Sequence, residues 1–419
     1  MGQTPRSARV PPDPLFVGPT THWYDTMNLL IEHSSQESLP DLDRHWASAQ
    51  TFAYAHEKSA AAVPWLRGIS EQLPPPYRQH HFCLLTSGST GAPKLVIGRK
   101  ENSEELAWVL HAAQHSEPVR ETIVALPLTY CYAFVNQWLW SRVMHRKLVL
   151  TSGFAKPELF RDALRSARDA MLCLVGPQAA LLRNTFGGDR FPGVIRLHFA
   201  GGRFPQEQLP ALHEMFPNAA IFNNYGCAEA LPRLTLRRAE DGESASDIGS
   251  PLPGVQLKCG EAGELLFLSQ YRCVAQIDDR GFHPLAPEEW IPNGDLVRDD
   301  GNGHWRLLGR AGEVFKRYGE KIALPQVLSS VNRQWHGQVA CYREKDSAGE
   351  DGYVLVLSPQ PSSENLQGLM QVFRSSHPRT HWPLRIESAA TLPLHSNGKV
   401  DSLALQSMEN RSLLWRQRI

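Results

Sequence analysis

The 419-residue sequence has no net charge, no long apolar run and no closely paired cysteines. Its 43 Lys and Arg balance 43 Asp and Glu, so no overall positive field attracts nucleic acid or an anionic membrane. No stretch approaches the roughly 18–20 apolar residues that a membrane-spanning helix needs. Residues 1–20 lack the apolar core of a secretory signal peptide. These absences predict a protein without a membrane span and without a nucleic-acid partner.

The seven cysteines are spread singly along the chain, without a CxxC pair. This odd, scattered set argues against a disulfide framework and against a zinc ribbon, and it predicts reduced thiols and a cytoplasmic location. Hydrophobic residues make up 42% and charged residues 21%, which is the composition of a globular protein and not of a disordered one. Composition therefore points to a soluble enzyme but says nothing of its chemistry.

From Phe82 onward, short apolar runs alternate with amphipathic segments, which predicts βαβ units and a largely parallel sheet. The predicted strands are Phe82–Leu85, Ile123–Leu126, Leu148–Leu150, Met171–Val175, Ile195–Phe199 and Ala219–Phe222. Helices are expected at Glu104–His115, Lys156–Asp169 and Gln206–Met215, and past Pro232 the strands become shorter. Before Phe82 the pattern is harder to interpret, with helical periodicity over Trp23–Glu32 and over Asp43–Ala61.

A second boundary falls near Gly309–Gly312. After it we expect a compact α+β unit, with helices at Pro325–Trp335 and Asn365–Ser376 and strands at Val339–Tyr342, Tyr353–Leu357 and Leu384–Ile386. The predicted fold class is therefore α/β. A large N-terminal domain (residues 1–310) combines βαβ layers, in mixed or parallel sheets, with a β-rich portion. A small, mobile α+β domain (residues 311–419) follows.

The strongest local signal is the segment Leu84-Leu-Thr-Ser-Gly-Ser-Thr-Gly-Ala-Pro-Lys94, in which a buried strand runs into a loop rich in hydroxyls and glycine. Glycines let backbone N–H groups approach an anion, hydroxyls donate further hydrogen bonds, and Lys94 adds positive charge, which together suit a polyphosphate. The spacing is not that of a P-loop, and Pro93 disfavours helix at Ala92. The segment is not a GxSxG nucleophile elbow either.

This segment resembles the phosphate loop of the adenylate-forming superfamily, which includes acyl-CoA synthetases, luciferases and the adenylation domains of nonribosomal peptide synthetases. Four further segments resemble the family's motifs in the family's order: Asn223-Asn-Tyr-Gly-Cys-Ala-Glu229, Gly294-Asp295, Gly309-Arg310 with Lys316 and Gly319, and Leu392-Pro-Leu-His-Ser-Asn-Gly-Lys399. The resemblance spans about residues 82 to 405. Each motif is weak alone, but five in order are specific together.

The resemblance implies a site for ATP and Mg²⁺. By it, the β- and γ-phosphates are held by Thr86, Ser87, Gly88, Ser89, Thr90, Gly91 and Lys94, and the Mg²⁺ ion by Glu229. Asn224, Tyr225 and Gly226 would hold the adenosine, with Tyr225 against the adenine face, and Asp295 and Arg310 would bind the ribose hydroxyls. Lys399 would bridge the acyl carboxylate and the α-phosphate, so that Lys399, Glu229 and Lys94 are the implied catalytic residues.

The same resemblance implies an acyl pocket formed by Tyr130, Phe134, Gly201, Gly202, Asn223 and Cys227. Relatives that activate α-amino acids usually carry an Asp in this region, and none occurs between Glu121 and Leu150. An aryl or fatty acid is therefore expected and not an amino acid. The chain departs from the family at Ala228, which replaces a Thr, at Gly312, the expected hinge, and in its short segment before the phosphate loop, which predicts a trimmed first subdomain.

The expected activity is ATP-dependent formation of an acyl-adenylate, followed by transfer to a thiol, either coenzyme A or the phosphopantetheine of a separate carrier protein. Monomer and homodimer both stay open. Two alternatives remain at this point. One is a catalytically impaired relative that only binds nucleotide or acyl ligand, which Ala228, Gly312 and the short N-terminus favour. The other is an adenylate-forming amide synthetase, which differs only in the acceptor.

Overall fold

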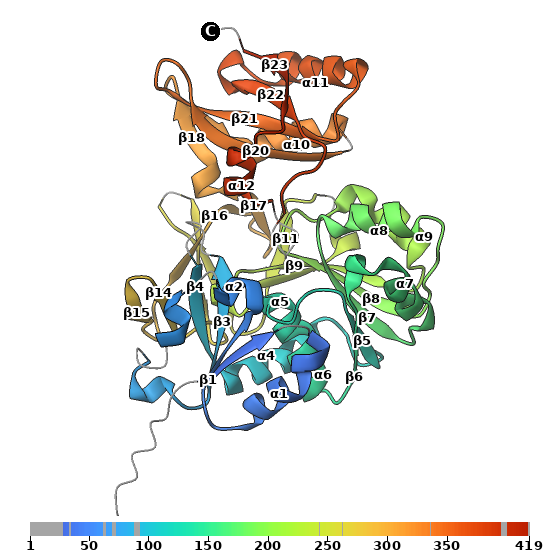
Figure 1. Ribbon diagram of the computed structural model, residues 1–419, viewed down its shortest axis with the longest axis vertical. Coiled ribbons are helices and arrows are strands. Elements are labelled where there is room, and N and C mark those ends of the chain that lie inside the picture. Colours follow the sequence, from blue (N-terminus) through green and yellow to red (C-terminus); the bar gives the residue numbers. More distant parts are fainter. Residues whose placement is uncertain are drawn as a thin grey trace, which may run out of the picture.

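A computed structural model describes residues 28–32, 35–61, 64–68, 73–87, 93–242, 244–261, 263–335, 337–394 and 400–417 (Figure 1). An eleven-stranded sheet and a six-stranded sheet form the larger part, and a four-stranded and a two-stranded sheet follow after residue 310. All seven cysteines are free, which confirms that no disulfide framework is present. Among the helices of the described residues, none has the length and apolar character needed to cross a membrane.

One half of the eleven-stranded sheet is parallel, which confirms the predicted βαβ organisation. Its strands are β5 (Glu121–Val124), β6 (Lys147–Leu150), β7 (Ala170–Val175), β8 (Val194–Ala200) and β9 (Ala220–Tyr225). The helices α7 (Pro157–Ser166), α8 (Gln178–Phe186) and α9 (Leu209–Met215) connect them. Every residue of β7 is buried, as expected for a strand covered on both faces. The carboxyl ends of these strands meet at one edge of the sheet.

The other half of this sheet is antiparallel and corresponds to the β-rich portion. It consists of β10 (Thr235–Arg238), β11 (Asp247–Pro251), β12 (Val255–Cys259), β13 (Glu264–Ser269), β16 (Ile291–Asp299) and β17 (Trp305–Arg310). Since β10 runs antiparallel to β9, the turn between them lies at the same edge as the carboxyl ends of the parallel strands. The chain thus brings residues 226–234 to the place where ligands bind in open α/β sheets.

The six-stranded sheet corrects two predictions. It contains β1 (Asn28–Glu32), β2 (Phe52–His56), β3 (His81–Ser87), β4 (Pro93–Arg99), β14 (Ala275–Asp278) and β15 (Gly281–Pro284). The helix predicted over Trp23–Glu32 is wrong where the structure describes it, because Asn28–Glu32 pairs in parallel with β2. The helix predicted over Asp43–Ala61 is also wrong, because α1 (Ser35–Ala47) ends there, β2 follows, and α2 (Glu57–Ala61) is short. Strand pairing to distant segments overrides the local periodicity.

The strand predicted at Phe82 exists, but it belongs to this second sheet and pairs in parallel with β2 and antiparallel with β4.

Between the two sheets lie α4 (Lys100–Ala113), α5 (Cys131–Ala133), the π-helical segment η3 (Phe134–Leu139) and α6 (Trp140–Val143). In the largest core cluster, Phe134 and Trp138 of η3 pack with Trp46 of α1 and Phe82 of β3. Short 3₁₀ turns complete this part: η1 (Pro64–Gly68), η2 (Pro75–Tyr77), η4 (Gly153–Ala155), η5 (Gln206–Gln208), η6 (Ala228–Ala230) and η7 (Ala239–Asp241).

The residues after β17 form the orange and red part at one end of the molecule (Figure 1). They comprise η8 (Ala311–Glu313), β18 (Val314–Arg317), β19 (Glu320–Ala323), α10 (Leu324–Gln334), β20 (Gln338–Lys345), β21 (Asp351–Ser358), α11 (Ser363–Ser376), η9 (Arg379–His381), β22 (Arg385–Ser388), α12 (Ser402–Ser407) and β23 (Ser412–Arg416). These residues have hydrophobic clusters of their own. The two helices and three strands that the sequence predicts here are all present. Pro325 of α10 packs against Gly309, where a Cβ atom would lie 2.5 Å from its Cγ.

Candidate active site

The base of the phosphate-loop segment is a β-hairpin. Thr86 of β3 pairs with Lys94 of β4, and its Oγ1 donates a hydrogen bond to the Lys94 carbonyl oxygen at 3.3 Å. The side chain of Ser87 and all of Gly88, Ser89, Thr90 and Gly91 lie outside the described residues. The structure therefore places the two ends of the predicted phosphate loop but not its tip.

Lys94 and Glu229 form an ion pair across the site, with Nζ of the lysine against Oε1 of the carboxylate. Both side chains are largely buried, with exposed fractions of 19% and 18%. Burial by itself raises the pKa of Glu229, but the positive charge and hydrogen bond of Lys94 outweigh it and hold that pKa below its ordinary value. Glu229 is thus a buried, ionised carboxylate beside a cation, which is the donor that a hard metal ion prefers.

The backbone around Glu229 is set by a close approach of two chain segments. Directly after β9, Gly226 lies so near the Pro232 carbonyl that a Cβ atom would come within 1.9 Å of that oxygen. The sequence needs glycine there for this reason. The tight crossing positions η6, which carries Glu229, at the carboxyl end of β9.

Tyr225, Asp295 and Arg310 come together from three strands. The Tyr225 hydroxyl donates to Asp295 Oδ2 at 2.5 Å, and Arg310 Nε forms an ion pair with Asp295 Oδ1 at 2.9 Å. Asp295 and Arg310 are direct partners in the pairing of β16 with β17. Burial and the Asp295 charge raise the pKa of Tyr225 well above its ordinary value, so this phenol stays protonated. The cluster offers a ring, a buried carboxylate and a half-exposed guanidinium side by side.

Gly201, one of the two predicted acyl-pocket glycines, lies against Tyr130. Gly201 follows β8 with a φ of 66°, and a Cβ atom there would lie 2.5 Å from the Tyr130 hydroxyl. Gly202 continues the same turn. Burial raises the pKa of Tyr130 to about 12. Cys227 is near Glu229, and its burial raises the pKa of its thiol well above the ordinary value, which argues against a nucleophilic role.

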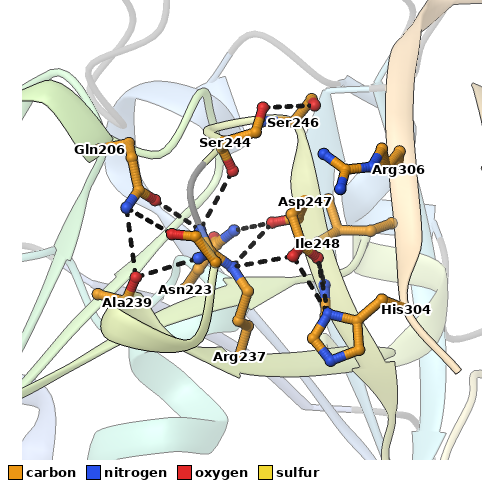
Figure 2. Close-up of polar contacts among 12 residues, drawn as sticks. Gln206, Asn223, Arg237, Ala239, Ser244, Ser246, Asp247, Ile248, His304 and Arg306 are labelled. Atoms are coloured by element: carbon orange, nitrogen blue, oxygen red, sulfur yellow. Dashed lines mark hydrogen bonds and ion pairs between the residues drawn. The ribbon is translucent and has the colours of Figure 1, made fainter. Parts of the chain in front are cut away.

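Asn223 and Asn224 leave opposite faces of β9, because successive strand residues alternate. The Asn224 amide donates to the Tyr132 hydroxyl at 2.8 Å, on the side of Tyr130. Asn223 donates to the Asp247 carbonyl oxygen at 2.9 Å, in the polar cluster around Arg237 (Figure 2). The structure therefore does not bring Asn223 together with the other predicted acyl-pocket residues.

Phe134 is also separate from the predicted pocket. It is fully buried and stacks on Phe82 with ring centroids 5.2 Å apart. Its neighbours Trp46 and Trp138 complete an aromatic core, so packing accounts for this side chain. Of the two aromatic residues predicted for the acyl pocket, Phe134 therefore belongs to the core, whereas Tyr130 faces Gly201.

The predicted catalytic lysine, Lys399, lies outside the described residues, which resume at Val400. The flanking residues Leu394 and Val400 form an antiparallel bridge. Gly312, the predicted hinge, lies in η8 with open space around its Cα atom. A hydrogen bond spans this turn: the backbone N–H of Arg310 donates to Glu313 Oε2 at 3.2 Å.

Three polar residues at the site were not found from the sequence. Asn293 donates to the Tyr225 hydroxyl at 2.6 Å, and Glu313 receives the Arg310 N–H. Arg233 is buried and donates to Asn224. Asn293 stands one residue before the Gly294-Asp295 pair, so its position was a usable signal. Nothing in the sequence distinguishes Arg233 from a surface arginine.

Comparison with known proteins agrees with this geometry. A family profile described as AMP-binding enzyme matches residues 26–266. A plipastatin synthase protein of Bacillus subtilis (strain 168) is 23% identical over 363 residues, which are 80% of this chain and 14% of that protein. D-alanine–D-alanyl carrier protein ligase of Staphylococcus aureus (strain Newman) is 22% identical over 360 residues, 78% of this chain and 71% of that protein. The chain thus spans a small part of the synthase and most of the ligase.

Two solved structures share the fold. The o-succinylbenzoate CoA synthetase of Bacillus subtilis in complex with its acyl-adenylate has a TM-score of 0.67 at 17% identity, with 92% of this chain and 88% of that chain covered. The anthranilate CoA ligase AuaEII in complex with anthranoyl-AMP also has a TM-score of 0.67, at 16% identity, with 88% and 80% covered. Identities this low show the fold alone.

Proposed function

We propose, since the chain belongs to the AMP-binding enzyme family, that it uses ATP to convert a carboxylic acid into an acyl-adenylate. One observation carries this proposal. Two ion pairs lie near the edge where the parallel strands end: Lys94 with Glu229, and Asp295 with Arg310. The chain connects them, because Tyr225 at the end of β9 bonds Asp295 and the following η6 carries Glu229. A nucleoside triphosphate needs both a phosphate site and a ribose site within its own length.

The phosphate half of the site is assigned to Lys94 and Glu229, with Thr86, Ser87, Gly88, Ser89, Thr90 and Gly91. The residues fit a Mg²⁺ ion, because Glu229 is a buried, ionised oxygen donor that already faces a cation. Mg²⁺ binds through one or two protein carboxylates together with phosphate oxygens and water, so a single glutamate suffices. When bound, the ion would neutralise the charge that develops on the leaving pyrophosphate. Lys94 would then move from the carboxylate to a phosphate oxygen.

The nucleoside half is assigned to Tyr225, Asp295 and Arg310, with Asn224 and Gly226 in the backbone turn beneath. Asp295 would accept hydrogen bonds from the ribose hydroxyls, because its ion pair with Arg310 holds the carboxylate in place. The Tyr225 ring would cover one face of the adenine. Its hydroxyl is already engaged by Asp295 and Asn293, which fixes the ring in one orientation.

In the reaction, an oxygen of the substrate carboxylate attacks the α-phosphorus of ATP, and the bond to pyrophosphate breaks. Lys399 is proposed to bind both the carboxylate and the α-phosphate in this step. The acyl group would extend past Tyr130, Gly201, Gly202 and Cys227. An aryl or fatty acid suits this wall better than an amino acid, since no carboxylate stands between Glu121 and Leu150 to receive an ammonium group.

In a second step, a thiol would attack the acyl carbonyl and AMP would leave. Residues 311–419 are proposed to form a small domain that turns about Gly312 between the two steps. The relatives support either acceptor, since some are named as CoA ligases and another as a carrier protein ligase. We therefore propose coenzyme A or a carrier-bound phosphopantetheine as the thiol, with an amine as the alternative acceptor.

The test is acid-dependent exchange of labelled pyrophosphate into ATP over aryl, fatty and amino acids. Exchange with at least one aryl or fatty acid is expected. Lys399→Ala should abolish exchange while leaving ATP binding, measured by calorimetry, unchanged. If no acid supports exchange, the chain only binds its ligands and the enzymatic proposal is wrong. Adding coenzyme A, phosphopantetheine or amines to the active acid then identifies the acceptor.

A further inference from the structure

Arg233 is an arginine buried without a carboxylate partner. Its residue is 1% exposed, and among the described residues no carboxylate forms an ion pair with it. One terminal nitrogen donates to Asn136 Oδ1 at 2.7 Å, and the other donates to Asn224 Oδ1 at 2.6 Å. Its Nε atom has no hydrogen-bond partner in the described part of the chain. Burying an unpaired charge in this way is costly.

Arg237, four residues further on, shows what a satisfied buried arginine looks like in the same fold. Its side chain is also inaccessible, and Figure 2 shows it ringed by acceptors. Its three nitrogens donate to the carbonyl oxygens of Asp247 and Ala239 and to Gln206 Oε1, and the Asp247 carboxylate lies 4.0 Å from Nε. The contrast shows that Arg233 is a buried guanidinium without a counter-anion among the described residues.

The environment of Arg233 offers only neutral groups. Asn224, which accepts from Arg233, also donates to the Tyr132 hydroxyl. His198 on β8 is buried, and burial and then the charge of Arg233 hold the pKa of its imidazole well below the ordinary value. The thiol of Cys173 on β7 stays protonated, because burial raises its pKa. Among the described residues, these neighbours of Arg233 supply no negative charge.

The residues around Arg233 adjoin the wall to which the acyl group is assigned. Tyr132 contacts Tyr130, with ring centroids 6.5 Å apart, and Tyr130 faces Gly201. Arg233 also follows Glu229 by four residues in the same turn, and its Cα lies 3.0 Å from where a Cβ of Gly226 would be. A molecule that presents one carboxylate near Glu229 could therefore present its far end to Arg233.

We infer that the substrate is a dicarboxylic acid, whose second carboxylate pairs with the Arg233 guanidinium while the first is activated. This inference rests on the proposed function, because it names the acid that the same site takes. Asn136 and Asn224 hold the guanidinium in one orientation, so a carboxylate meets a prearranged partner. A site with a buried, unpaired donor also rejects an analogue that cannot accept from it.

The experiment compares each diacid with the monoacid and the half-amide of the same skeleton, over aliphatic diacids of increasing length and the benzenedicarboxylates. Acid binding is measured by calorimetry without ATP, and pyrophosphate exchange is measured separately. At least one diacid should bind at least about tenfold more tightly than its monoacid and its half-amide. Monoacids or half-amides that bind as tightly as every diacid would overturn the inference, as would the absence of any diacid binding.

Two substitutions of Arg233 test whether this residue causes the preference for diacids. Arg233→Gln should abolish the diacid preference, and Arg233→Lys should weaken it. The matched control is Arg237→Gln, which removes an equally buried guanidinium from the far side of β9 and should leave the preference intact. If Arg233→Gln does not fold, the comparison of each diacid with its half-amide on the unaltered chain still tests whether the second carboxylate strengthens binding. Diacid binding without exchange would contradict the proposed activity but support this inference, so the two failures are distinguishable.

Discussion

Lys94 and Glu229 lie 135 positions apart in the sequence and form an ion pair beside the base of the predicted phosphate loop. Lys94 reaches the site from β4 of the six-stranded sheet, whereas Glu229 follows β9 of the eleven-stranded sheet. The pair therefore joins the two sheets at the point where the proposed phosphates bind. The charge and hydrogen bond of Lys94 hold the pKa of Glu229 below its ordinary value, so the carboxylate stays ionised without a ligand.

Removing the carboxylate should impair metal-dependent exchange. Glu229→Gln is expected to lower pyrophosphate exchange by about 10²-fold, the usual size of losing one electrostatic contact to a transition state. It should also raise the Mg²⁺ concentration at half-maximal rate, which a magnesium titration measures. Glu240→Gln is the control, because Glu240 makes only half-exposed contacts with Arg238 and His213. An unchanged magnesium dependence in Glu229→Gln would contradict the metal assignment.

The pH dependence of stability should reveal the same pair. Because Lys94 lowers the folded-state pKa of Glu229 below 4.5, its stabilisation is present above pH 4.5 and is lost as the pH falls through the folded-state pKa. In Lys94→Met the burial that raises this pKa is opposed only by a backbone hydrogen bond and by the Cys227 thiol, so the folded-state pKa is higher and the variant lacks stabilisation that the unaltered chain gains as the pH rises. The difference in unfolding free energy between the two proteins should grow from about pH 4 to about pH 7.

Urea unfolding at several pH values measures this difference. The double variant Lys94→Met with Glu229→Gln is the control, since it has no buried carboxylate at this place. Its stability relative to the unaltered chain should not show the growing penalty of Lys94→Met at neutral pH. If Lys94→Met lowers the unfolding free energy by the same amount at about pH 4 and at about pH 7, ionisation of Glu229 beside Lys94 does not contribute to stability.

Asp295→Asn keeps the shape of the side chain but removes its charge. The substitution breaks the ion pair with Arg310. It also replaces the carboxylate that accepts the hydrogen bond of the Tyr225 hydroxyl with a neutral, weaker acceptor. We expect the KM for ATP to rise by at least about tenfold, because ribose hydroxyls bind a charged acceptor more strongly than a neutral one. Asp278→Asn, which removes an ion pair with Arg280 in the β14–β15 hairpin, should leave that KM unchanged. Equal effects of the two substitutions would argue against the ribose assignment.

Gly226→Ala should be severely destabilising. The added Cβ atom would lie 1.9 Å from the Pro232 carbonyl oxygen, which is backbone and cannot turn away. A loss of more than about 3 kcal/mol in unfolding free energy is expected, because the crossing of the two segments must open. Gly312→Ala is the matched substitution, since a Cβ atom there meets no atom within 4 Å. Thermal unfolding should show a large drop for the first variant and little change for the second.

Lys100 offers a test of the fold away from the site. Its buried ammonium donates to the carbonyl oxygens of His45, in the last turn of α1, and of Ser48 and Gln50, just beyond that helix, at 2.8–3.1 Å. Burial lowers the pKa of Lys100 to about 8, so the amine is still protonated at neutral pH. Lys100→Met should lower the unfolding free energy by about 2–3 kcal/mol, because charged hydrogen bonds are lost. Arg120→Met, at the exposed ion pair with Asp169, should change it by less than about 1 kcal/mol.

The site residues could be found from the sequence where a motif carries its own chemistry. Lys94, Glu229, Asp295 and Arg310 stand in short segments whose residue types suit phosphate, metal and ribose, and the structure places them in two adjoining clusters. Asn223 could not be assigned in this way. Its neighbour Asn224 has the same chemistry, and only the pairing of β9 decides which of the two faces Tyr132 and which faces Asp247.

The sequence by itself determined the chemistry available to this protein and the alternation of strands and helices that carries it. Those properties are local, because they depend on residue types and on periods of a few residues. Only the tertiary structure decided that residues 28–32 form a strand, that Phe134 belongs to the core and that Arg233 is buried without a carboxylate. Strand pairing, packing and burial are contacts between segments far apart in the chain. Their free energies outweigh local preference, so no pattern within one segment can reveal them.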